Sequence, residues 1–134
     1  MLSAPTVLDG LRFLGVSKAM NQATDFSEVF SRLAREGRNE ETTQLGGVNV
    51  RLVKVKGGGE GRWDHHDRTT ETVVVWSGDF TVEFRDHALH LSSGQCCVVP
   101  VGAEHRGTSK AGADVILFQQ AHSAGARRGM EDDR

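Results

Sequence analysis

The pattern of apolar and polar positions predicts a chain built mainly of short β-strands. Short apolar runs separated by glycine-containing turns extend from residue 48 to residue 119, which is typical of a sandwich or a barrel. The segment VNVRLVKVK at 48–56 alternates in two blocks whose phase slips between Leu52 and Val53. We therefore expect one strand with a β-bulge at the slip.

Two basic residues, Arg51 and Lys54, flank this slip. Either side chain could point inward to meet an anionic substrate, but strand residues of this type more commonly lie on a solvated face. A solvated position is the prediction for both.

Two further strands are predicted on either side of Gly78. The run TVVVW at 72–76 is continuously apolar, and the segment 79–85 alternates regularly, as in a strand with one face in water. A hairpin through Ser77 and Gly78 is expected to join them. Four shorter strands should follow, at 87–91, 95–99, 106–109 and 114–119.

One amphipathic helix is predicted ahead of the strands, over residues 25–36. Its apolar residues fall on one helical face: Phe26, Val29, Phe30 and Leu33. Asp25 can cap the helix together with Glu28, and Gly37 can terminate it.

The chain organisation predicts one domain with two extensions. A domain over 25–121, which includes the helix, carries all of the periodic sequence. Residues 1–24 show no sustained period and are predicted to form an arm. Residues 122–134 are rich in alanine, glycine and charge and are predicted to form a flexible tail.

Composition narrows the possible partners and locations. The 134 residues carry a net charge of −2 with both signs spread along the chain, so no basic stripe is present for nucleic acid. No apolar run approaches the length that spans a bilayer, and the N-terminus lacks the pattern of a signal peptide. A cytoplasmic protein that binds neither nucleic acid nor membrane is expected.

The two cysteines, Cys96 and Cys97, are adjacent, so a disulfide between them would be strained and a reducing compartment is indicated. In a strand their side chains point to opposite faces. Both are expected to pack as small apolar residues, and the inward one could approach an interior cavity.

The most informative motif lies between Gly94 and His105, where the residues read G-x5-P-x-G-x2-H. Gly94 turns the chain into a short strand, and Pro100 and Gly102 form a tight turn. His105 starts the return strand, so this turn can aim its imidazole into a barrel.

A second polar motif, WDHHDRTTE at 63–71, fits two spacings. The first spacing, G-x5-D-x-H-x4-E-x6-G, uses Gly58, Asp64, His66, Glu71 and Gly78. The second spacing, G-x5-H-x-D-x3-E, uses Gly59, His65, Asp67 and Glu71. Positions 64 and 66 share one face of a strand and 65 and 67 share the other, so only one pair can line a barrel.

Together the two motifs resemble the paired signatures of the cupin superfamily. The resemblance implies an all-β fold, a double-stranded β-helix or jelly-roll barrel, with the short helix before it. We favour the first spacing because Trp63 and the sequence FRD at 84–86 resemble a group of small cupins with W-H-x-H-x4-E. Two positions depart from the superfamily: Asp64 replaces a histidine, and Ser109 stands where an asparagine is common.

The resemblance also implies one divalent metal ion in the barrel. Its ligands would be His66, Glu71 and His105, with Asp64 as a fourth ligand, as a support for a ligand, or as a base acting on a substrate. Imidazole with carboxylate suits Fe²⁺, Mn²⁺, Zn²⁺ or Ni²⁺. Glu71 and Asp64 are the candidate catalytic residues.

Three functions are compatible with such a barrel. The first is a metal-dependent enzyme that acts on a small polar metabolite by isomerase, lyase or dioxygenase chemistry. The alternative is a non-catalytic module that binds a small-molecule ligand, and the third is a purely structural dimerisation unit. Small cupins commonly pair, so a homodimer is expected in each case.

Overall fold

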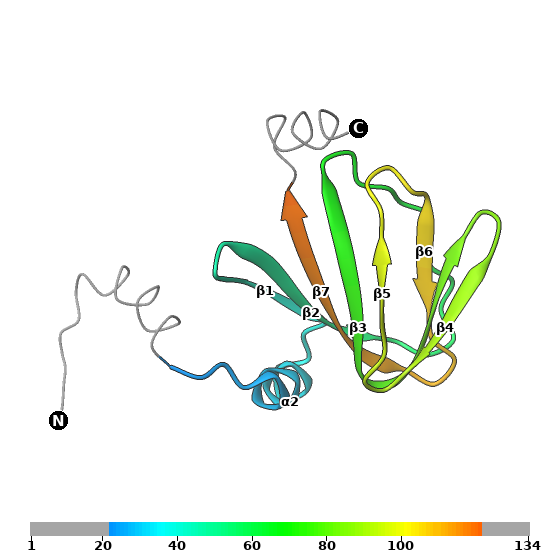
Figure 1. Ribbon diagram of the computed structural model, residues 1–134. Coiled ribbons are helices and arrows are strands. Elements are labelled where there is room, and N and C mark those ends of the chain that lie inside the picture. Colours follow the sequence, from blue (N-terminus) through cyan, green and yellow to red (C-terminus); the bar gives the residue numbers. More distant parts are fainter. Residues whose placement is uncertain (1–21, 122–134) are drawn as a thin grey trace, which may run out of the picture.

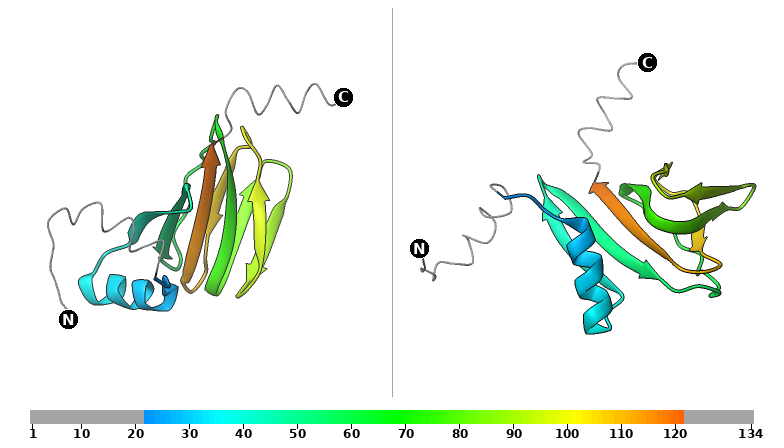
Figure 2. Two further views of the ribbon diagram at one scale, coloured as in Figure 1. Left: turned by 60° about the vertical axis from the view of Figure 1, so that its left-hand side comes forward. Right: turned by 90° about the horizontal axis from the view of Figure 1, so that it is seen from below.

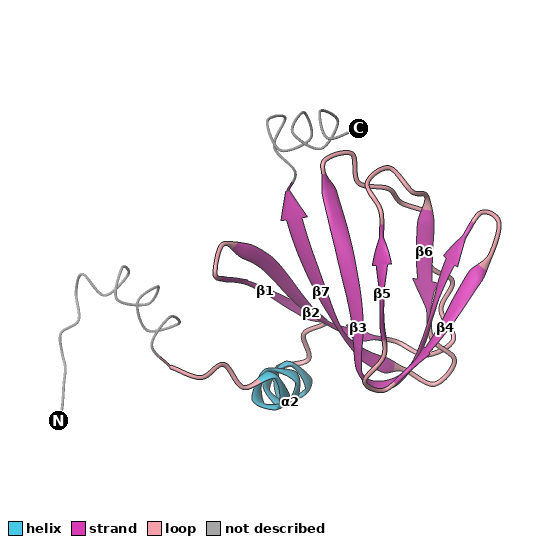
Figure 3. Ribbon diagram, viewed as in Figure 1, coloured by secondary structure: helices cyan, strands magenta, loops and turns pink. Residues whose placement is uncertain are grey.

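The computed structural model describes residues 22–121, and Figure 1 shows its elements in order along the chain. The elements are α2 (Phe26–Glu36), β1 (Glu40–Leu45), β2 (Val48–Val55), β3 (Thr69–Phe84), β4 (Ala88–Ser92), β5 (Cys96–Val99), β6 (His105–Thr108) and β7 (Ala113–Ala121). Strands therefore make up most of the described chain, as Figure 3 shows. The predicted arm and tail lie almost wholly outside these residues and stay predictions.

The strands form two antiparallel sheets that share the long strand β3. The first half of β3 pairs with β5 on one side and with β7 on the other, and the order continues through β2 to β1. The second half of β3 pairs with β4 and β6. This arrangement confirms the predicted all-β, jelly-roll barrel.

The main core lies between the two sheets, where the inward side chains of both sheets meet. Its buried members are Val73, Val75, Phe80, Val82, Leu91, Val99, Ala113 and Val115. All except alanine are branched or aromatic, which suits residues that pack on a pleated surface. Burial of these side chains provides most of the hydrophobic stabilisation of the barrel.

A second core lies on the outer face of the first sheet, beneath helix α2. Phe30 and Leu33 of the helix are buried against Val50, Leu52 and Ile116. Figure 2 shows the helix beside β1 and β2, on the side away from β4 and β6. The first sheet is therefore covered on both faces in this region.

The predicted bulge in β2 is wrong, because the double coverage explains the phase slip. The pairing of β2 with β7 runs without interruption from Asn49 to Val55. Leu52 faces the helix and Val55 packs against the main core, so both faces of the strand are apolar. Such a strand shows a change of phase in its sequence without any change of register.

The predicted hairpin at Ser77 and Gly78 is also wrong. Strand β3 runs continuously from Thr69 to Phe84 and passes from one sheet to the other, with an irregularity in its pairing with β7 between Val75 and Ser77. Gly78 has φ 90°, and an added Cβ would lie 2.5 Å from the carbonyl oxygen of Gly112. Glycine therefore permits a close backbone crossing at this corner rather than a turn.

Strand β1 was not predicted, because its sequence EETTQL is almost entirely polar. Among the strands of residues 22–121 it pairs only with β2, and it stands at the edge of the first sheet. On its helix-facing side, Glu41 forms a bidentate ion pair with Arg32 of α2 at 2.8 and 3.0 Å. Polar contacts of this kind give no apolar alternation in the sequence.

The predicted helix is confirmed, together with both of its caps. Asp25 accepts a hydrogen bond from the backbone N–H of Glu28 at 3.1 Å, and Gly37 ends the helix in the left-handed conformation. No helix within residues 22–121 is long and apolar enough to cross a bilayer.

Removal of the N-terminal cap should measurably destabilise the protein. We expect Asp25→Ala to lower the free energy of unfolding by about 1 kcal/mol, because an N–H of the first turn loses its acceptor. Asp25→Asn, which keeps an acceptor, should lose less in the same urea titration. Equal losses in the two variants would contradict a capping role.

Candidate metal centre

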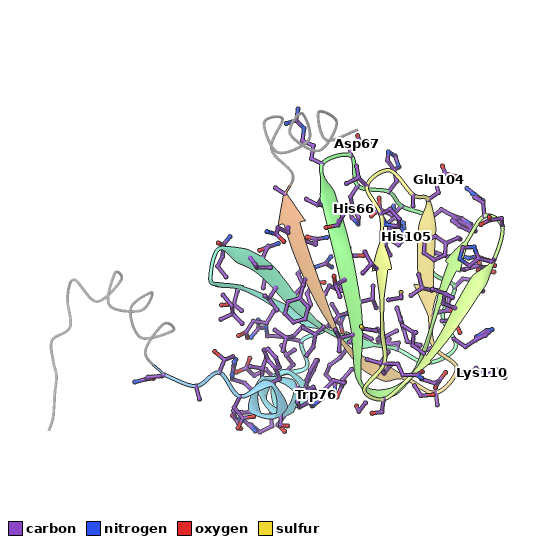
Figure 4. All side chains as sticks on the ribbon, viewed as in Figure 1. His66, Asp67, Trp76, Glu104, His105 and Lys110 are labelled. Atoms are coloured by element: carbon purple, nitrogen blue, oxygen red, sulfur yellow. The ribbon has the colours of Figure 1, made fainter. Side chains whose placement is uncertain are left out.

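Two histidines and one glutamate converge at one end of the barrel. His105 is the first residue of β6, Glu71 lies near the start of β3, and His66 lies in the segment between β2 and β3. One ligand atom from each residue lies within 4.8 Å of the others. Figure 4 shows His66 and His105 near this end of the strands, whereas Trp76 lies beside α2 at the opposite end.

The turn after β5 positions His105. Gly102 has φ 81°, and the N–H of Ala103 donates to the carbonyl of Pro100 at 3.2 Å, which closes the turn directly before β6. Nδ1 of His105 lies 2.9 Å from the carbonyl oxygen of Ala103. A carbonyl can only accept, so Nδ1 carries a proton and Nε2 is the ring nitrogen that could bind an ion.

Backbone hydrogen bonds connect the two sequence motifs directly. Asp64 and His105 exchange two N–H···O bonds, each 2.9 Å long, and the N–H of Gly102 donates to the carbonyl of His66 at 2.8 Å. The segment that carries His66 is therefore fixed on the turn that carries His105. The rings of these two histidines have centroids 5.3 Å apart.

Glu71 completes the group from the neighbouring strand and is 4% exposed. Its Oε1 lies 3.4 Å from Nε2 of His105, and its Oε2 lies 3.7 Å from Nε2 of His66. Gln119, its partner on β7, donates its amide N–H to Oε2 at 2.8 Å. The carboxylate is thus held between both imidazoles.

The structure brings His66 into the group and leaves His65 outside it. His65 is exposed, and its Nε2 lies 3.3 Å from the carboxylate of Asp67, which is also exposed. The alternation expected of the first spacing is therefore observed. The metal-ligand roles of His66, Glu71 and His105 remain a prediction.

Asp64 has a different place from these three residues. It borders the same cavity, but it is exposed and its Oδ1 accepts a hydrogen bond from the N–H of His65 at 2.8 Å. It does not belong to the group of converging ligand atoms. Its predicted role as ligand, support or base stays a prediction.

The group opens into a cavity of about 250 Å³. Apolar side chains of both sheets line its walls: Val55, Val73, Phe80, Val82 and Leu117. Charged residues border it as well, among them Arg51 and Arg62. The cavity combines apolar walls with a few polar groups, as sites for small molecules do, and its volume lies slightly below the usual range of about 300–1,000 Å³.

Trp63, in the segment that carries His66, contacts two arginines. The guanidinium carbons of Arg85 and Arg106 lie 3.7 and 4.8 Å from the ring centroid of Trp63. Arg85 also donates to Glu104 at 2.8 Å, and this hydrogen bond holds the pKa of the Glu104 carboxyl below its usual value. Trp63 therefore fixes the segment on β6 through stacking.

The inward cysteine is Cys97, which packs against the main core. Burial raises the pKa of the Cys97 thiol, and the nearby thiol of Cys96 and the carboxylate of Glu71 raise it further. The thiol of Cys97 is therefore neutral at physiological pH. A neutral thiol is a poor metal ligand.

The donor set fits a divalent metal ion. Two imidazole nitrogens and one carboxylate oxygen lie close together, with Glu71 and His105 buried and His66 half-buried, and they match the ligands that Fe²⁺, Mn²⁺, Zn²⁺ and Ni²⁺ accept in proteins. The hydrogen bonds from His105 to Ala103 and from Gln119 to Glu71 orient these donors from behind. The mixture of a buried carboxylate and two histidines is therefore a candidate metal centre.

Sequence reasoning missed Gln119 as part of this centre. The strand at 114–119 was predicted, and inward positions on β7 alternate through Val115, Leu117 and Gln119. A polar residue at the end of an apolar inward row was the available signal. Its partner Glu71 on β3 emerges only from the strand register.

Loss of this support should weaken metal binding without removing a ligand. We expect Gln119→Leu to reduce metal affinity by about tenfold or more, since residues that orient ligands typically contribute 10–100-fold. Calorimetric titration with Zn²⁺ measures the effect. Gln120→Leu, at the exposed neighbouring position, is the matched control, and an equal loss there would contradict the assignment.

A double-stranded β-barrel with a His/Glu/His group at its open end defines a class of proteins, the cupins. A profile of the cupin domain matches residues 51–118, which is half of the chain, and the chain belongs to this family. The membership confirms the resemblance seen in the sequence. The comparison with curated protein sequences found no match.

Three solved structures show the same fold. A cupin-2 domain containing protein from Shewanella frigidimarina is 25% identical, with a TM-score of 0.65 over 75% of this chain and 95% of that chain. Protein NMB1881 from Neisseria meningitidis is 23% identical, with a TM-score of 0.64 over 75% of this chain and 100% of that chain. The iron(II) form of HppE in complex with substrate is 13% identical, with a TM-score of 0.54 over 60% of this chain and 52% of that chain.

Proposed function

We propose that this cupin is a metal-dependent enzyme that acts on a small polar metabolite, with one divalent ion bound by His66, Glu71 and His105. The observation that carries the proposal is the convergence of these three side chains at a cavity of about 250 Å³. The iron(II) form of HppE has the same fold and binds a substrate, which supports a metal site in a barrel of this kind.

The residues around the cavity supply distinct parts of such a reaction. A bound ion would act as a Lewis acid toward oxygen atoms of the substrate. Asp64 borders the cavity with a carboxylate that can accept a proton from a bound molecule. We assign proton transfer to Asp64 rather than to Glu71, because Glu71 is enclosed by Gln119 and two histidines.

The shape of the cavity favours chemistry on a small molecule. Val73, Val82 and Leu117 exclude water from one side, which strengthens electrostatic interactions at the polar end. Isomerase, lyase and dioxygenase reactions can each use a bound metal ion that polarises oxygen atoms of the substrate, and the first two can also use a nearby residue that accepts a proton. The reaction is proposed at the level of this group.

The adjacent residues His65 and His66 allow a direct test of the metal centre. We expect the purified protein to contain close to one equivalent of Fe, Mn, Zn or Ni by elemental analysis, or to bind one equivalent in calorimetric titration. His66→Ala should lose this ion, whereas His65→Ala should retain it, because only the former ring lies in the group.

Three results would contradict the proposal. These are wild-type protein that binds none of the four ions, equal retention of the ion by both variants, and loss of the ion only in His65→Ala. The last result would instead support the second spacing, in which His65 and Asp67 face the ion.

The homodimer and the cytoplasmic location stay proposals. Small cupins commonly pair, and strand β1 stands at a sheet edge with backbone groups available to a second strand. Light scattering of the purified protein at several concentrations measures the oligomeric state.

A further inference from the structure

The cavity at the candidate metal centre is bordered by an arginine on strand β2. Arg51 lies opposite Leu117 of β7, and both residues border the cavity. Its neighbours Val50 and Leu52 lie on the other face, beneath α2. Arg51 is therefore half-buried on the inner face, and one of its nitrogens lies 3.0 Å from the carboxylate of Glu40.

A second arginine borders the cavity from the segment between β2 and β3. Arg62, Asp64 and His66 are alternate residues of this segment, and all three border the cavity. Within residues 22–121, Arg62 makes no hydrogen bond or ion pair. Its guanidinium is therefore available, with several N–H donors, to an anion in the cavity.

Arg106 also borders the cavity, but its guanidinium is already engaged. It donates to Glu83 at 2.7 Å and stacks on Trp63. This residue has a structural role on the outer face, so Arg62 is the principal free cation of the cavity among the described residues.

The balance of charge around the cavity also favours an anionic ligand. Arg51 and Arg106 are offset by Glu40 and Glu83, which leaves Arg62 against Asp64 and Glu71, a net charge of −1. A divalent ion bound to Glu71 changes this balance to +1. Arg62 and Asp64 are exposed and Glu71 is buried, so a single anionic group on the substrate would offset the charge of the ion in the buried part of the site, where an uncompensated charge is costly.

We propose that the cavity binds a small organic anion whose carboxylate or phosphate group is held by Arg62, with Arg51 beside it. The proposal rests on the proposed function in one respect: the rest of the anion meets the metal centre. Arginine suits this task because its planar guanidinium can pair with two oxygens of one group. Arg62 is a specificity-determining residue that selects anionic over neutral ligands.

Paired ligands of similar size test this selection. Glycolate is the carboxylate probe, inorganic phosphate is the phosphate probe, and glycolamide is the neutral counterpart of glycolate. Each is titrated calorimetrically into protein loaded with Mn²⁺ and freed of excess ion, and into ion-free protein. We expect one or both anions to bind, glycolamide to bind at least about tenfold more weakly, and added salt to weaken the anions only.

Two arginines of the same segment provide the matched variants. Arg62→Gln should weaken anion binding by about tenfold or more, since charge-assisted hydrogen bonds are the stronger class. Arg62→Lys keeps the charge and should lose less. Arg68→Gln, at an exposed arginine that does not border the cavity, should change anion binding less than twofold. Mn²⁺ content should be the same in all three variants.

The outcomes separate this proposal from the metal proposal. Mn²⁺ binding without any effect of Arg62→Gln on glycolate or phosphate would overturn the anion site and leave the metal centre intact. Anion binding that depends on Arg62 in a protein that binds no metal ion would support the anion site and overturn the metal centre. Equal loss in Arg68→Gln, equal binding of glycolamide, or no binding of either anion would overturn the anion site.

Discussion

Metal affinity should fall by at least about a hundredfold when Glu71 is replaced by glutamine. The substitution keeps the size of the side chain but removes the negative charge at the centre of the group, between Nε2 of His66 and Nε2 of His105. Loss of an anionic ligand should exceed the 10–100-fold effect of residues that only orient ligands. Calorimetric titration of wild type and Glu71→Gln with Zn²⁺ and Mn²⁺ measures it.

The same substitution should have the opposite effect on the ion-free fold. Glu71 is 4% exposed, and a buried carboxylate loses hydration that its hydrogen bond with Gln119 only partly replaces. We therefore expect ion-free Glu71→Gln to melt at the same temperature as ion-free wild type or higher. A clear drop in that melting temperature would show that the carboxylate serves the fold rather than the ion.

Gly107→Ala should lower the stability of the protein clearly, although it adds only one methyl group. An ideal Cβ at this position would lie within 3.0 Å of three atoms of the Phe80 ring. Phe80 is part of the main core and is 8% exposed, so its ring has little room to move. Overpacking of this kind costs about 1–3 kcal/mol, which corresponds to a fall of roughly 4–12 °C in melting temperature.

Two variants provide the controls for Gly107→Ala. Gly59→Ala adds the same methyl group where nothing lies within 4 Å, so its melting temperature should stay close to that of wild type. Combining Gly107→Ala with Phe80→Leu removes the ring atoms that the methyl group meets. The pair should lose less stability than the sum of the single variants, and strict additivity would rule out the steric explanation.

The repeated pattern of short apolar runs and turns predicted a sandwich or a barrel, and the resemblance of the two motifs to the cupin signatures implied the jelly-roll barrel. Helix α2 was predictable from one apolar face and two capping residues, all of which act locally. His105 was predictable because Pro100 and Gly102 fix the turn that precedes it. These features depend on residues close together in the chain, where sequence spacing and spatial arrangement agree.

The errors in the predicted strands arose where distant segments decide the structure. Residues 48–56 seemed irregular because a helix covers one face of β2, which no local pattern reveals. Gly78 suggested a turn, but its lack of a side chain serves an approach to Gly112. The same glycine signal therefore fits two structures, and only the tertiary contact distinguishes them.

The candidate site was predictable in its central residues and not in its surroundings. His66, Glu71 and His105 follow a spacing, whereas Gln119 meets Glu71 only through the register of β7 on β3. Arg62 carries no signal at all in the sequence, because one arginine in a polar segment resembles any solvated residue. The spacing of residues along the chain does not reveal partners that come from distant strands.

The attachment of the segment between β2 and β3 has a consequence for the energetics of ligand binding. This segment joins the barrel through backbone hydrogen bonds at Gly58, Asp64 and His66, and it has no place in a regular strand. Segments held in this way open locally at a lower free energy than the whole domain. Since His66 and Arg62 both belong to it, each opening would remove one proposed ligand of the ion and one proposed contact of the anion together. Binding of the ion and binding of the anion would then favour each other. The first of them to bind loses binding free energy to the ordering of this short segment, and the second does not.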